Sequence, residues 1–299
     1  MSAAAALPLR AMLFVPGDSE RKQIKSLSSG ADAVIIDLED SVVPERRQEA
    51  RILTRDFIAA HRHDDNAPDL WLRINPLDTP DAEEDIETVL QAQPVGIVLP
   101  KCTGPEQVTE LDQLLFERER HAGIVEGSTA ILPIVTETPG AAMTLHRYLR
   151  GNFVGKARLA GLSWGAEDLS AAIGASRKRE SDGSWTFPYQ MVRAQLLLTA
   201  HALDVQAIDT LHADFHDTEG LIAYAGNGRS DGFSGMLAIH PAQVEPIQKA
   251  FTSSAEEIAE AEAVVAAFAA NPGAGAVSLD GKMLDRPHLK LAERILAQR

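Results

Sequence analysis

Residues 32–42 read DAVIIDLEDSV, an apolar stretch that runs directly into three carboxylates. Its first half is continuously apolar and rich in β-branched residues, as in a parallel strand that is covered on both faces. Asp37, Glu39 and Asp40 follow where that strand would end. The stretch therefore predicts a buried strand whose carboxyl end carries acidic side chains.

Similar apolar runs recur along the whole chain, with stretches of helical periodicity between them, such as residues 105–120 and 187–204. Alternation of this kind predicts repeated βα units, and eight units predict an α/β fold of the (β/α)8 TIM barrel type. An open doubly wound sheet is the alternative, but no G-x-G-x-x-G follows the first run. The eight runs are AMLFVPG (11–17), DAVIIDLED (32–40), DLWLRINP (69–76), VGIVLPK (95–101), AILPIVTET (130–138), RLAGLSWGAEDL (158–169), VQAIDTLHAD (205–214) and GMLAIHP (235–241).

The chain continues beyond the eighth run, so we expect a barrel domain over residues 1–250 and a C-terminal helical extension over 251–299. The extension contains an acidic, alanine-rich helix at 253–270, a turn-rich stretch at 271–283 and an amphipathic helix at 287–298. A barrel does not require this segment. It is therefore either an outer helical layer or a mobile flap.

Composition limits the classes of function. The 299 residues carry a formal charge of -15 and have a pI of about 5.0, so a nucleic-acid partner is not expected. A single cysteine, Cys102, excludes an intrachain disulfide and favours a reducing compartment. The first residues lack a signal-peptide pattern and no apolar run reaches the length of a membrane span, so we expect a cytoplasmic protein without a membrane partner.

If the eight runs are barrel strands, their carboxyl ends share one rim, and this rim carries the active site in barrel enzymes. Polar side chains collect at these ends. Neighbouring strands lie about 4.8 Å apart, so residues that follow consecutive strands can reach one point. The rim candidates are Asp37, Glu39 and Asp40 after the second run, Arg73 and Asn75 after the third, Lys101 after the fourth, Glu137 after the fifth, and Glu167 and Asp168 within the sixth.

Several carboxylates that converge in a partly buried site repel each other unless a cation lies between them. Oxygen donors without cysteine or histidine favour a hard ion, and Mg²⁺ held by one or two carboxylates is the best fit. A metal beside Arg73 and Lys101 suits an α-hydroxy or α-keto carboxylate. Such a site stabilises an alkoxide or enolate, which predicts the making or breaking of a carbon–carbon bond next to a carbonyl.

A series of motifs makes the chain resemble the citrate lyase beta-subunit family of the HpcH/HpaI aldolase/citrate lyase superfamily. The resemblance extends nearly from end to end. It implies a (β/α)8 barrel that uses Mg²⁺ to cleave a 3-hydroxyacyl-coenzyme A thioester, of the citryl-, malyl- or citramalyl-CoA type, into an acetyl-CoA-type product and a keto acid. It also implies a homotrimer or homohexamer. The motifs are RAMLFVPG, DAVIIDLEDSV, LRINP, GIVLPK, IVTETPGA, GAEDLSAAIG, AIHPAQVEPI and GKMLDRPHLKLAERIL.

The same resemblance implies roles for individual residues. Glu137 of TETPGA and Asp168 of EDL resemble the direct metal ligands. Glu39 and Asp40 of DLED resemble groups that hold the metal's water molecules. Arg73 of RINP resembles the clamp for the keto-acid carboxylate. Asp285 of KMLDRPH resembles the acid/base that a C-terminal flap delivers, in this family often into a neighbouring subunit.

Coenzyme A binding is where this chain departs from the family that it resembles. Relatives commonly carry a basic residue before AIHP, where this chain has Met236. The phosphates must then rely on other cations. Lys101 and Arg10 are the preferred candidates, with the basic residues of segment 21–25 as further ones.

Two alternatives remain open. One is a pyruvate-type class II aldolase of the same superfamily, although such enzymes place a histidine base on an early loop and FVPGDSERKQ (14–23) has none. The other is a non-catalytic relative that binds a coenzyme A ester or a partner protein. Release of a keto acid from a coenzyme A thioester distinguishes the lyase from both.

Overall fold

The structure of the chain, a computed structural model, describes residues 9–297 and divides after Lys249 into two compact units. The expected barrel domain began at residue 1 and the last expected helix reached residue 298, so both expectations run beyond the described part. Within the described part of the first unit, eight strands form one parallel sheet in the order β5-β4-β3-β2-β1-β8-β7-β6. These strands are β1 (Ala11–Pro16), β2 (Ala33–Asp37), β3 (Asp69–Arg73), β4 (Gly96–Leu99), β5 (Ala130–Pro133), β6 (Gly161–Ser163), β7 (Gln206–Asp209) and β8 (Gly235–Ala238).

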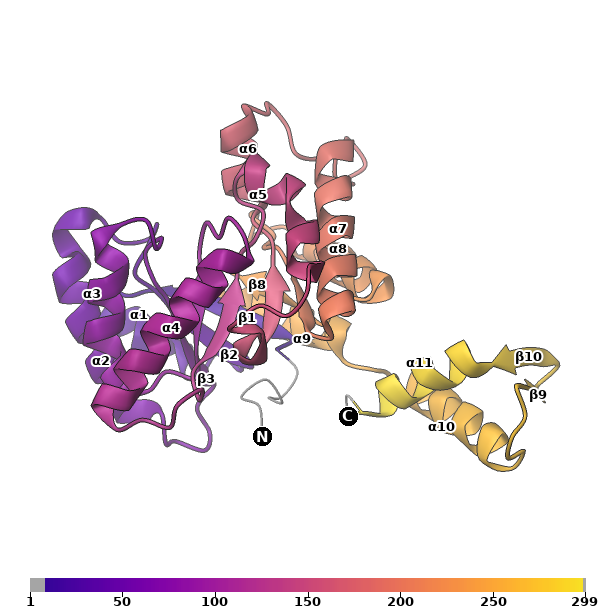
Figure 1. Ribbon diagram of the computed structural model, residues 1–299. Coiled ribbons are helices and arrows are strands. Elements are labelled where there is room, and N and C mark those ends of the chain that lie inside the picture. Colours follow the sequence, from indigo (N-terminus) through magenta and orange to yellow (C-terminus); the bar gives the residue numbers. More distant parts are fainter. Residues whose placement is uncertain (1–8, 298–299) are drawn as a thin grey trace. The chain divides into compact units, whose positions relative to one another are not determined.

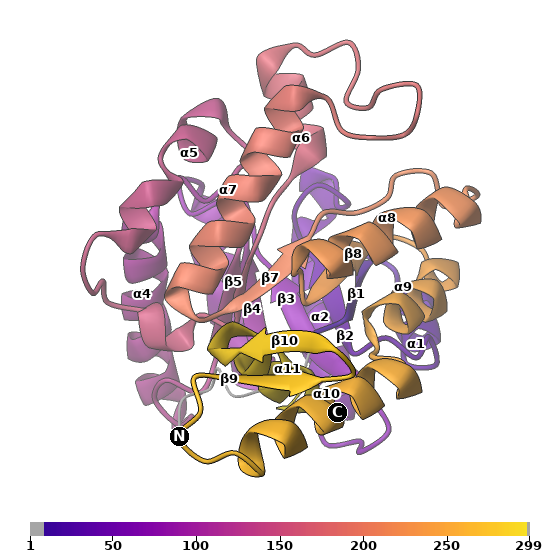
Figure 2. The same ribbon diagram turned by 90° about the vertical axis from the view of Figure 1, so that its right-hand side faces the viewer.

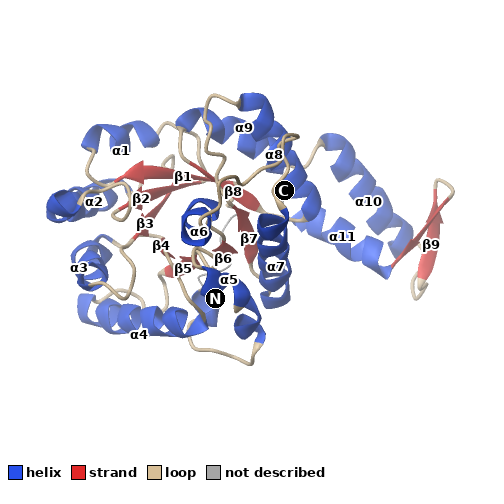
Figure 3. Cartoon of the chain, turned by 90° about the horizontal axis from the view of Figure 1, so that it is seen from above, coloured by secondary structure: helices blue, strands red, loops and turns tan. Residues whose placement is uncertain are grey.

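The sheet closes between β5 and β6. Parallel bridges join Ile131 to Leu159 and Ile134 to Ser163, and the Ala160 N–H donates to the Ile131 carbonyl at 3.0 Å. The strands form a ring with helices around it (Figure 3). The prediction of a (β/α)8 TIM barrel is confirmed, and each of the eight quoted runs contains one of its strands.

Helices follow the strands and cover the outside of the barrel. Two short ones, α5 and α6, stand beyond the carboxyl ends of β5 and β6 (Figure 1). Nowhere in residues 9–297 does a helix combine the length and the apolar character needed to cross a membrane. The α-helices of the first unit are α1 (Glu20–Ser26), α2 (Arg47–His61), α3 (Pro80–Val89), α4 (Pro105–Ala122), α5 (Pro139–Met143), α6 (Ala166–Ile173), α7 (Phe187–Leu203), α8 (Thr218–Asp231) and α9 (Val244–Phe251), which runs across the boundary.

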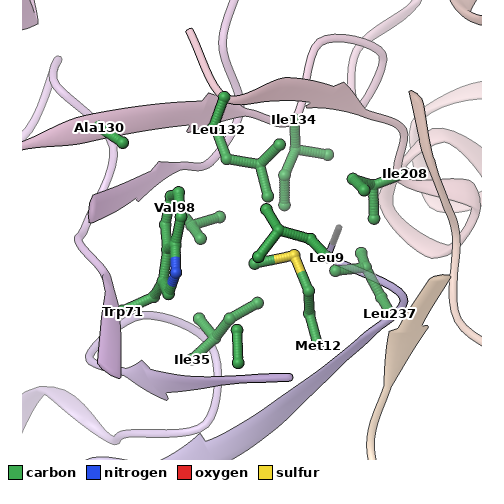
Figure 4. Packing of buried hydrophobic residues seen from close by; sticks show 12 residues of the cluster. Leu9, Met12, Ile35, Trp71, Val98, Ala130, Leu132, Ile134, Ile208 and Leu237 are labelled. Atoms are coloured by element: carbon green, nitrogen blue, oxygen red, sulfur yellow. The ribbon is translucent and has the colours of Figure 1, made fainter. Parts of the chain in front are cut away.

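The barrel interior is a packed apolar core. Side chains from all around the ring meet there, with Trp71 of β3 as the largest (Figure 4). The neighbouring position on β4 is Gly96, where a Cβ would lie 2.3 Å from the Trp71 ring. The indole therefore requires a glycine beside it. Core members include Leu9, Met12, Ile35, Val98, Leu132, Ile134, Ile208 and Leu237.

One segment of the first unit has a structure that its composition does not suggest. Residues 225–235, AGNGRSDGFSG, contain four glycines, as is typical of a loop, but residues up to Asp231 continue α8. Glycine lowers helix propensity by about 1 kcal/mol. Here Tyr224, Ala225 and Gly228 are buried, so packing overrides that preference.

The second unit has its own small core, built by residues of α10 (Ala255–Ala269), a hairpin and α11 (Arg286–Ala297). The turn-rich stretch contains this hairpin, whose strands are β9 (Ala276–Leu279) and β10 (Lys282–Asp285) (Figure 2). Asp280 and Gly281 form its two-residue turn with φ of 49° and 76°. Asp-Gly is the signal for such a turn, so the hairpin was recognisable from the sequence.

Candidate active site

The carboxyl rim of the barrel gathers most of the predicted polar side chains. All eight strands are parallel, so the residues that follow them lie at the same end of the ring. Ion pairs and electrostatic contacts connect these residues into one cluster, which we call the rim cluster. Its members are Asp37, Glu39, Asp40, Arg73, Lys101, Glu137 and Asp168.

Arg73 and Asp37 form the rigid side of the rim cluster. They are the last residues of β3 and β2 and lie opposite each other in the strand register. The guanidinium binds the carboxylate with two contacts, from Nε to Oδ1 at 2.6 Å and from Nη2 to Oδ2 at 2.7 Å. The Arg73 side chain also lies over the Phe14 ring at 4.7 Å and is only 12% exposed. The two hydrogen bonds and the ring contact hold the guanidinium in one orientation.

Asp37 and Arg73 each stabilise the ionised form of the other. Burial alone would raise the pKa of Asp37, but the Arg73 guanidinium lowers it below its usual value. Burial alone would likewise lower the pKa of Arg73, and the Asp37 carboxylate raises it instead. Both side chains are therefore ionised at neutral pH. The pairing of Asp37 with Arg73 was not predicted from the sequence. The available signal was that the two residues end adjacent strands.

Asp37 also fixes the turn that carries the next carboxylates. Its side chain accepts hydrogen bonds from the Glu39 N–H at 2.9 Å and the Ser41 N–H at 3.1 Å. Asn75 stabilises the same turn, because its side-chain amide donates to the Leu38 carbonyl at 3.0 Å. The Asn75 side chain is buried, so its role is to support the DLED turn.

Glu39 is the second carboxylate that contacts Arg73. Its Oε2 lies 2.8 Å from Nη1 of Arg73, and its Oε1 binds the Lys101 ammonium. The side chain is only 3% exposed, and burial raises its pKa despite these two cations. Asp40 adds a further negative charge at the exposed side of the turn.

Lys101 lies at the centre of the carboxylates. Its Nζ contacts Glu39, Asp40 Oδ1 at 3.2 Å and Asp168 Oδ1 at 3.7 Å. These carboxylates raise the pKa of Lys101, although burial opposes them. Its backbone has a positive φ of 50°, and the N–H donates to Glu137 Oε2. This residue therefore connects four carboxylates through its side chain and its backbone.

Glu137 is the least compensated carboxylate of the rim cluster. It is only 3% exposed, and burial is the largest cause that raises its pKa, to about 8. The Lys101 N–H opposes this rise, while the nearby Asp168 and Glu39 carboxylates add to it. At neutral pH such a group keeps a proton unless a cation lies beside it.

Gly165 makes the placement of Glu137 sterically possible. A Cβ at this position would lie 2.5 Å from Cγ of Glu137. Gly165 precedes α6, so the close approach also brings Glu137 toward Asp168 in the first turn of that helix.

The rim cluster fits a magnesium ion. Glu137 and Asp168 offer oxygen donors only, and Mg²⁺ in proteins usually takes one or two carboxylates and completes its octahedron with water and substrate. A group of three or more histidine, cysteine or acidic side chains that could hold a metal is not found in residues 9–297. The raised pKa of Glu137 is the electrostatic sign of a cation site.

Arg10 is the predicted site residue of the first unit that the structure does not bring to the rim. It precedes β1 and lies at the amino end of the strands. Its guanidinium pairs with Asp32, with Nη2 and Oδ1 2.7 Å apart. Parallel strands separate their two ends by their whole length, so Arg10 does not join the rim cluster.

A pocket of about 350 Å³ opens beside the carboxyl ends of β1 and β8. Arg21, Lys22 and Lys25 of α1 line one side of it, and Phe14 and His240 line another. A cavity is therefore lined by the basic residues of segment 21–25, and not by Lys101 or Arg10, which the sequence favoured for the phosphates.

Met236, the departure noted before AIHP, is fully buried in β8. It pairs with Ala11 near the amino end of β1 and with Asp209 of β7. The side chain belongs to the packing of the barrel and not to the pocket.

Asp285 belongs to the second unit, where it ends β10 and precedes α11. Its Oδ1 lies 2.6 Å from Nδ1 of His288, and the carboxylate side chain is 43% exposed. Within its own unit Asp285 is therefore accessible and has one polar side-chain partner among the described residues.

Comparison with known proteins agrees with this geometry. The sequence model of the HpcH/HpaI aldolase/citrate lyase family matches residues 10–241. The mitochondrial citramalyl-CoA lyase of Rattus norvegicus is 33% identical over 298 residues, which cover 97% of this chain and 86% of that protein. Citrate lyase subunit beta of Haemophilus influenzae is 29% identical, with coverage of 96% and 95%.

A solved structure extends the agreement to three dimensions. It is that of CitE from Mycobacterium tuberculosis in complex with magnesium, acetoacetate and coenzyme A. The two chains share 31% identity and a TM-score of 0.77, and the match covers 99% of this chain and 98% of the other.

Proposed function

Because the chain belongs to the HpcH/HpaI aldolase/citrate lyase family, we propose that its rim cluster cleaves a 3-hydroxyacyl-coenzyme A thioester into an acetyl-CoA-type product and a keto acid. The chain is a magnesium-dependent carbon–carbon lyase. Citryl-, malyl- and citramalyl-CoA are the thioesters of this class. One observation carries the proposal: Arg73, Glu137 and Asp168 converge in a barrel similar to one solved with magnesium, a keto acid and coenzyme A.

Glu137 and Asp168 are the proposed ligands of Mg²⁺, and Glu39 and Asp40 the proposed acceptors for its water molecules. When bound, the ion polarises the substrate oxygen and stabilises negative charge as the carbon–carbon bond breaks. Lys101 contacts three of these carboxylates and holds them in place.

Arg73 is the proposed clamp for the carboxylate of the keto-acid part. Asp37 occupies its Nε and one Nη2 donor, which fixes the plane of the guanidinium. A guanidinium has five N–H donors, so donors remain for a planar carboxylate. This fixed plane orients the 3-hydroxyl toward the metal ligands.

Proton transfer completes the reaction. A rim carboxylate accepts the proton of the 3-hydroxyl, and the bond between the two product halves breaks. Its electron pair moves to the carbon beside the thioester carbonyl and forms an enolate. We assign protonation of that carbon to Asp285.

The pocket beside β1 and β8 is the proposed site for the phosphates of coenzyme A. It is lined by Arg21, Lys22 and Lys25, and none of the three forms an ion pair within residues 9–297. Lys101 and Arg10 are both engaged by carboxylates. The overall acidic chain makes a local cluster of cations necessary for an anionic ligand.

A homotrimer or homohexamer in the cytoplasm is the proposed working form. In such an assembly the second unit of one chain would deliver Asp285 into the site of its neighbour. Mass measurement in solution tests the oligomeric state. Fractionation of the source cells tests the location, since the citramalyl-CoA lyase relatives are mitochondrial proteins.

The activity test uses the full-length protein with Mg²⁺ and citryl-, malyl- or citramalyl-CoA, and measures the free keto acid. We expect turnover of at least one thioester, and its loss when EDTA removes the metal. A blank panel combined with tight binding of the thioesters would instead identify a non-catalytic binding protein. Activity on a hydroxy-keto acid without coenzyme A would identify a class II aldolase.

A further inference from the structure

A series of buried hydrogen bonds leads from the outer helices to the rim cluster. It begins between α2 and α3, which lie side by side on the outside of the barrel (Figure 1). Arg51 of α2 donates from Nε to Oδ1 of Asp85 on α3 at 2.7 Å. The two side chains are 3% and 0% exposed. Asp85 is therefore a fully buried carboxylate outside the rim cluster, and none of the proposed reaction steps involves it.

The second oxygen of Asp85 binds Asn75, which follows β3. Oδ2 accepts from the Asn75 backbone N–H and from its side-chain amide, both at 2.8 Å. The same amide donates to the Leu38 carbonyl at 3.0 Å. Because the Leu38 carbonyl can only accept, the NH₂ group of Asn75 must face it, and both amide protons are then used. The Asn75 side chain therefore has a single orientation.

Leu38 is the residue of the DLED turn that Asn75 holds. Its N–H donates to the Arg73 carbonyl at 3.0 Å, and its carbonyl accepts from Asn75. Both polar backbone groups of Leu38 are therefore bound by the end of β3 and the residues after it. Glu39, the next residue, places its carboxylate 2.8 Å from Nη1 of Arg73. Since Leu38 and Glu39 share one peptide group, a shift of the Leu38 carbonyl would displace the Glu39 carboxylate.

We propose that Asp85 is a positioning residue for the magnesium site: it holds Asn75, and through Asn75 it sets the turn that carries Glu39 and Asp40. The inference rests on the proposed function, in which these two carboxylates hold the water molecules of Mg²⁺. In this role Asp85 contacts neither the metal nor the substrate. Groups that orient the residues around a metal raise its affinity without binding it themselves.

A purely structural role for Asp85 would need only the contact between α2 and α3. Arg51 makes that contact without Asp85 as well, because its guanidinium also pairs with Asp81 and with Glu84 Oε2, the latter at 2.6 Å. Two of the three hydrogen bonds to Asp85 come instead from Asn75. The fold should therefore tolerate the loss of the Asp85 charge, whereas the geometry of the DLED turn should not.

The experiment compares Asp85→Asn with Glu119→Gln in the full-length protein. Each change replaces a buried carboxylate with its uncharged amide, and each carboxylate binds an arginine and two further N–H donors. Both variants should therefore lose stability in denaturant unfolding with EDTA. The donors to Glu119 come from Arg158 and the loop after α4, and not from the DLED turn. We expect the Kd for Mg²⁺, measured by calorimetry, to rise about tenfold in Asp85→Asn and to keep its wild-type value in Glu119→Gln.

Asn75→Ala, alone and combined with Asp85→Asn, tests the route. This variant keeps Arg51 and Asp85 in place and removes the hydrogen bond to Leu38, so it should also raise the Kd for Mg²⁺. If Asp85 acts through Asn75, the double variant should lose less affinity than the product of the two single effects. Single effects that multiply, or wild-type Mg²⁺ affinity in either single variant, would overturn the inference.

The proposed function and this inference fail in different ways. A wild type that neither binds Mg²⁺ nor releases a keto acid from a thioester would refute the proposed function, and the inference with it. An active wild type whose Asp85→Asn variant is less stable but binds Mg²⁺ normally would leave the proposed function intact. Asp85 would then be a structural residue only.

Discussion

Glu119 and Glu137 are both buried glutamates of the barrel unit, yet their surroundings move their pKa values in opposite directions. Glu119 is on α4 and meets four donors: two from Arg158 at 2.8 Å, and the N–H groups of Gly127 and Thr129 at 2.7 and 3.0 Å. Burial would raise its pKa, but these donors lower it overall. The protein itself supplies every partner that this carboxylate needs.

Glu137 has a different environment. One backbone N–H reaches it, and two further carboxylates lie nearby, so its pKa rises to about 8. The comparison distinguishes a buried carboxylate with a structural role from one in a ligand site. A carboxylate that has hydrogen-bond donors and a guanidinium within the protein stabilises the fold. A carboxylate whose neighbours are mainly other carboxylates requires a bound cation.

The largest expected effect is that of Glu137→Gln. Removing this proposed metal ligand should lower kcat/KM by about 10³-fold, because the negative charge that develops in the transition state loses its stabilisation. Calorimetry should show the loss of Mg²⁺ binding at the same time. Glu126→Gln, an exposed carboxylate, serves as the control.

The same variant should not lose stability. The native pKa of Glu137, about 8, lies above the ordinary value of 4.5. Between these pH values the unfolded chain loses the Glu137 proton while the metal-free native chain keeps it, so the unfolding free energy falls as the pH rises. Glutamine cannot ionise, so metal-free Glu137→Gln should unfold at a higher temperature than metal-free wild type at pH 8. A lower unfolding temperature would contradict the comparison.

Glu119→Gln should show the reverse pattern. It removes the bidentate carboxylate partner of the buried Arg158 guanidinium and leaves Asp112 as the remaining one, which costs about 2 kcal/mol of unfolding free energy. Mg²⁺ affinity and kcat of the folded protein should remain at wild-type values. Denaturant unfolding and a metal titration on one sample measure both, and a loss of metal binding would remove the distinction between the two glutamates.

Gly165→Ala is a finer test of the rim. The new Cβ would lie 2.5 Å from Cγ of Glu137, so the carboxylate must shift while the rest of the barrel remains. We expect Mg²⁺ affinity to fall about tenfold, as when a metal ligand loses its support. Gly140→Ala, where a Cβ meets nothing within 4 Å, is the control, and equal affinities for both variants would refute the steric argument.

The smallest effect is the pH dependence carried by Glu119. Because its native pKa lies below the ordinary value of 4.5, its contribution is complete above that value. It is lost as the pH falls through the lowered native pKa. The difference in unfolding free energy between wild type and Glu119→Gln should therefore be constant near neutral pH and shrink in acid. A difference that grows in acid would reverse the sign of the argument.

Most of the barrel was predictable because its strands are buried on both faces. Each strand has to be continuously apolar, and the sequence pattern reports this directly. The hairpin of β9 and β10 is exposed on one side, so its composition reads as turns, and only Asp280-Gly281 indicates it. The second half of α8 was not predictable from propensity, since the burial of Ala225 and Gly228 outweighs the low helix propensity of glycine.

The rim cluster was predictable in its members but not in its pairings. Parallel strands guarantee that residues at their carboxyl ends share one edge, so Arg73, Lys101 and Asp168 follow from topology. Distances between loops decide whether Lys101 is available for a phosphate or binds a carboxylate. In the structure its ammonium group forms an ion pair with Glu39.

The amino-acid sequence alone determined the strand count, the acidic rim and the family motifs, because burial and chain order are written in local residue patterns. Tertiary structure alone decided that Asp37 locks Arg73, that Arg10 lies at the far end of β1, and that Glu137 lacks the donors which surround Glu119. These outcomes depend on which side chains meet across the ring. Contacts between distant segments set the local charge balance, and no stretch of sequence contains that balance by itself.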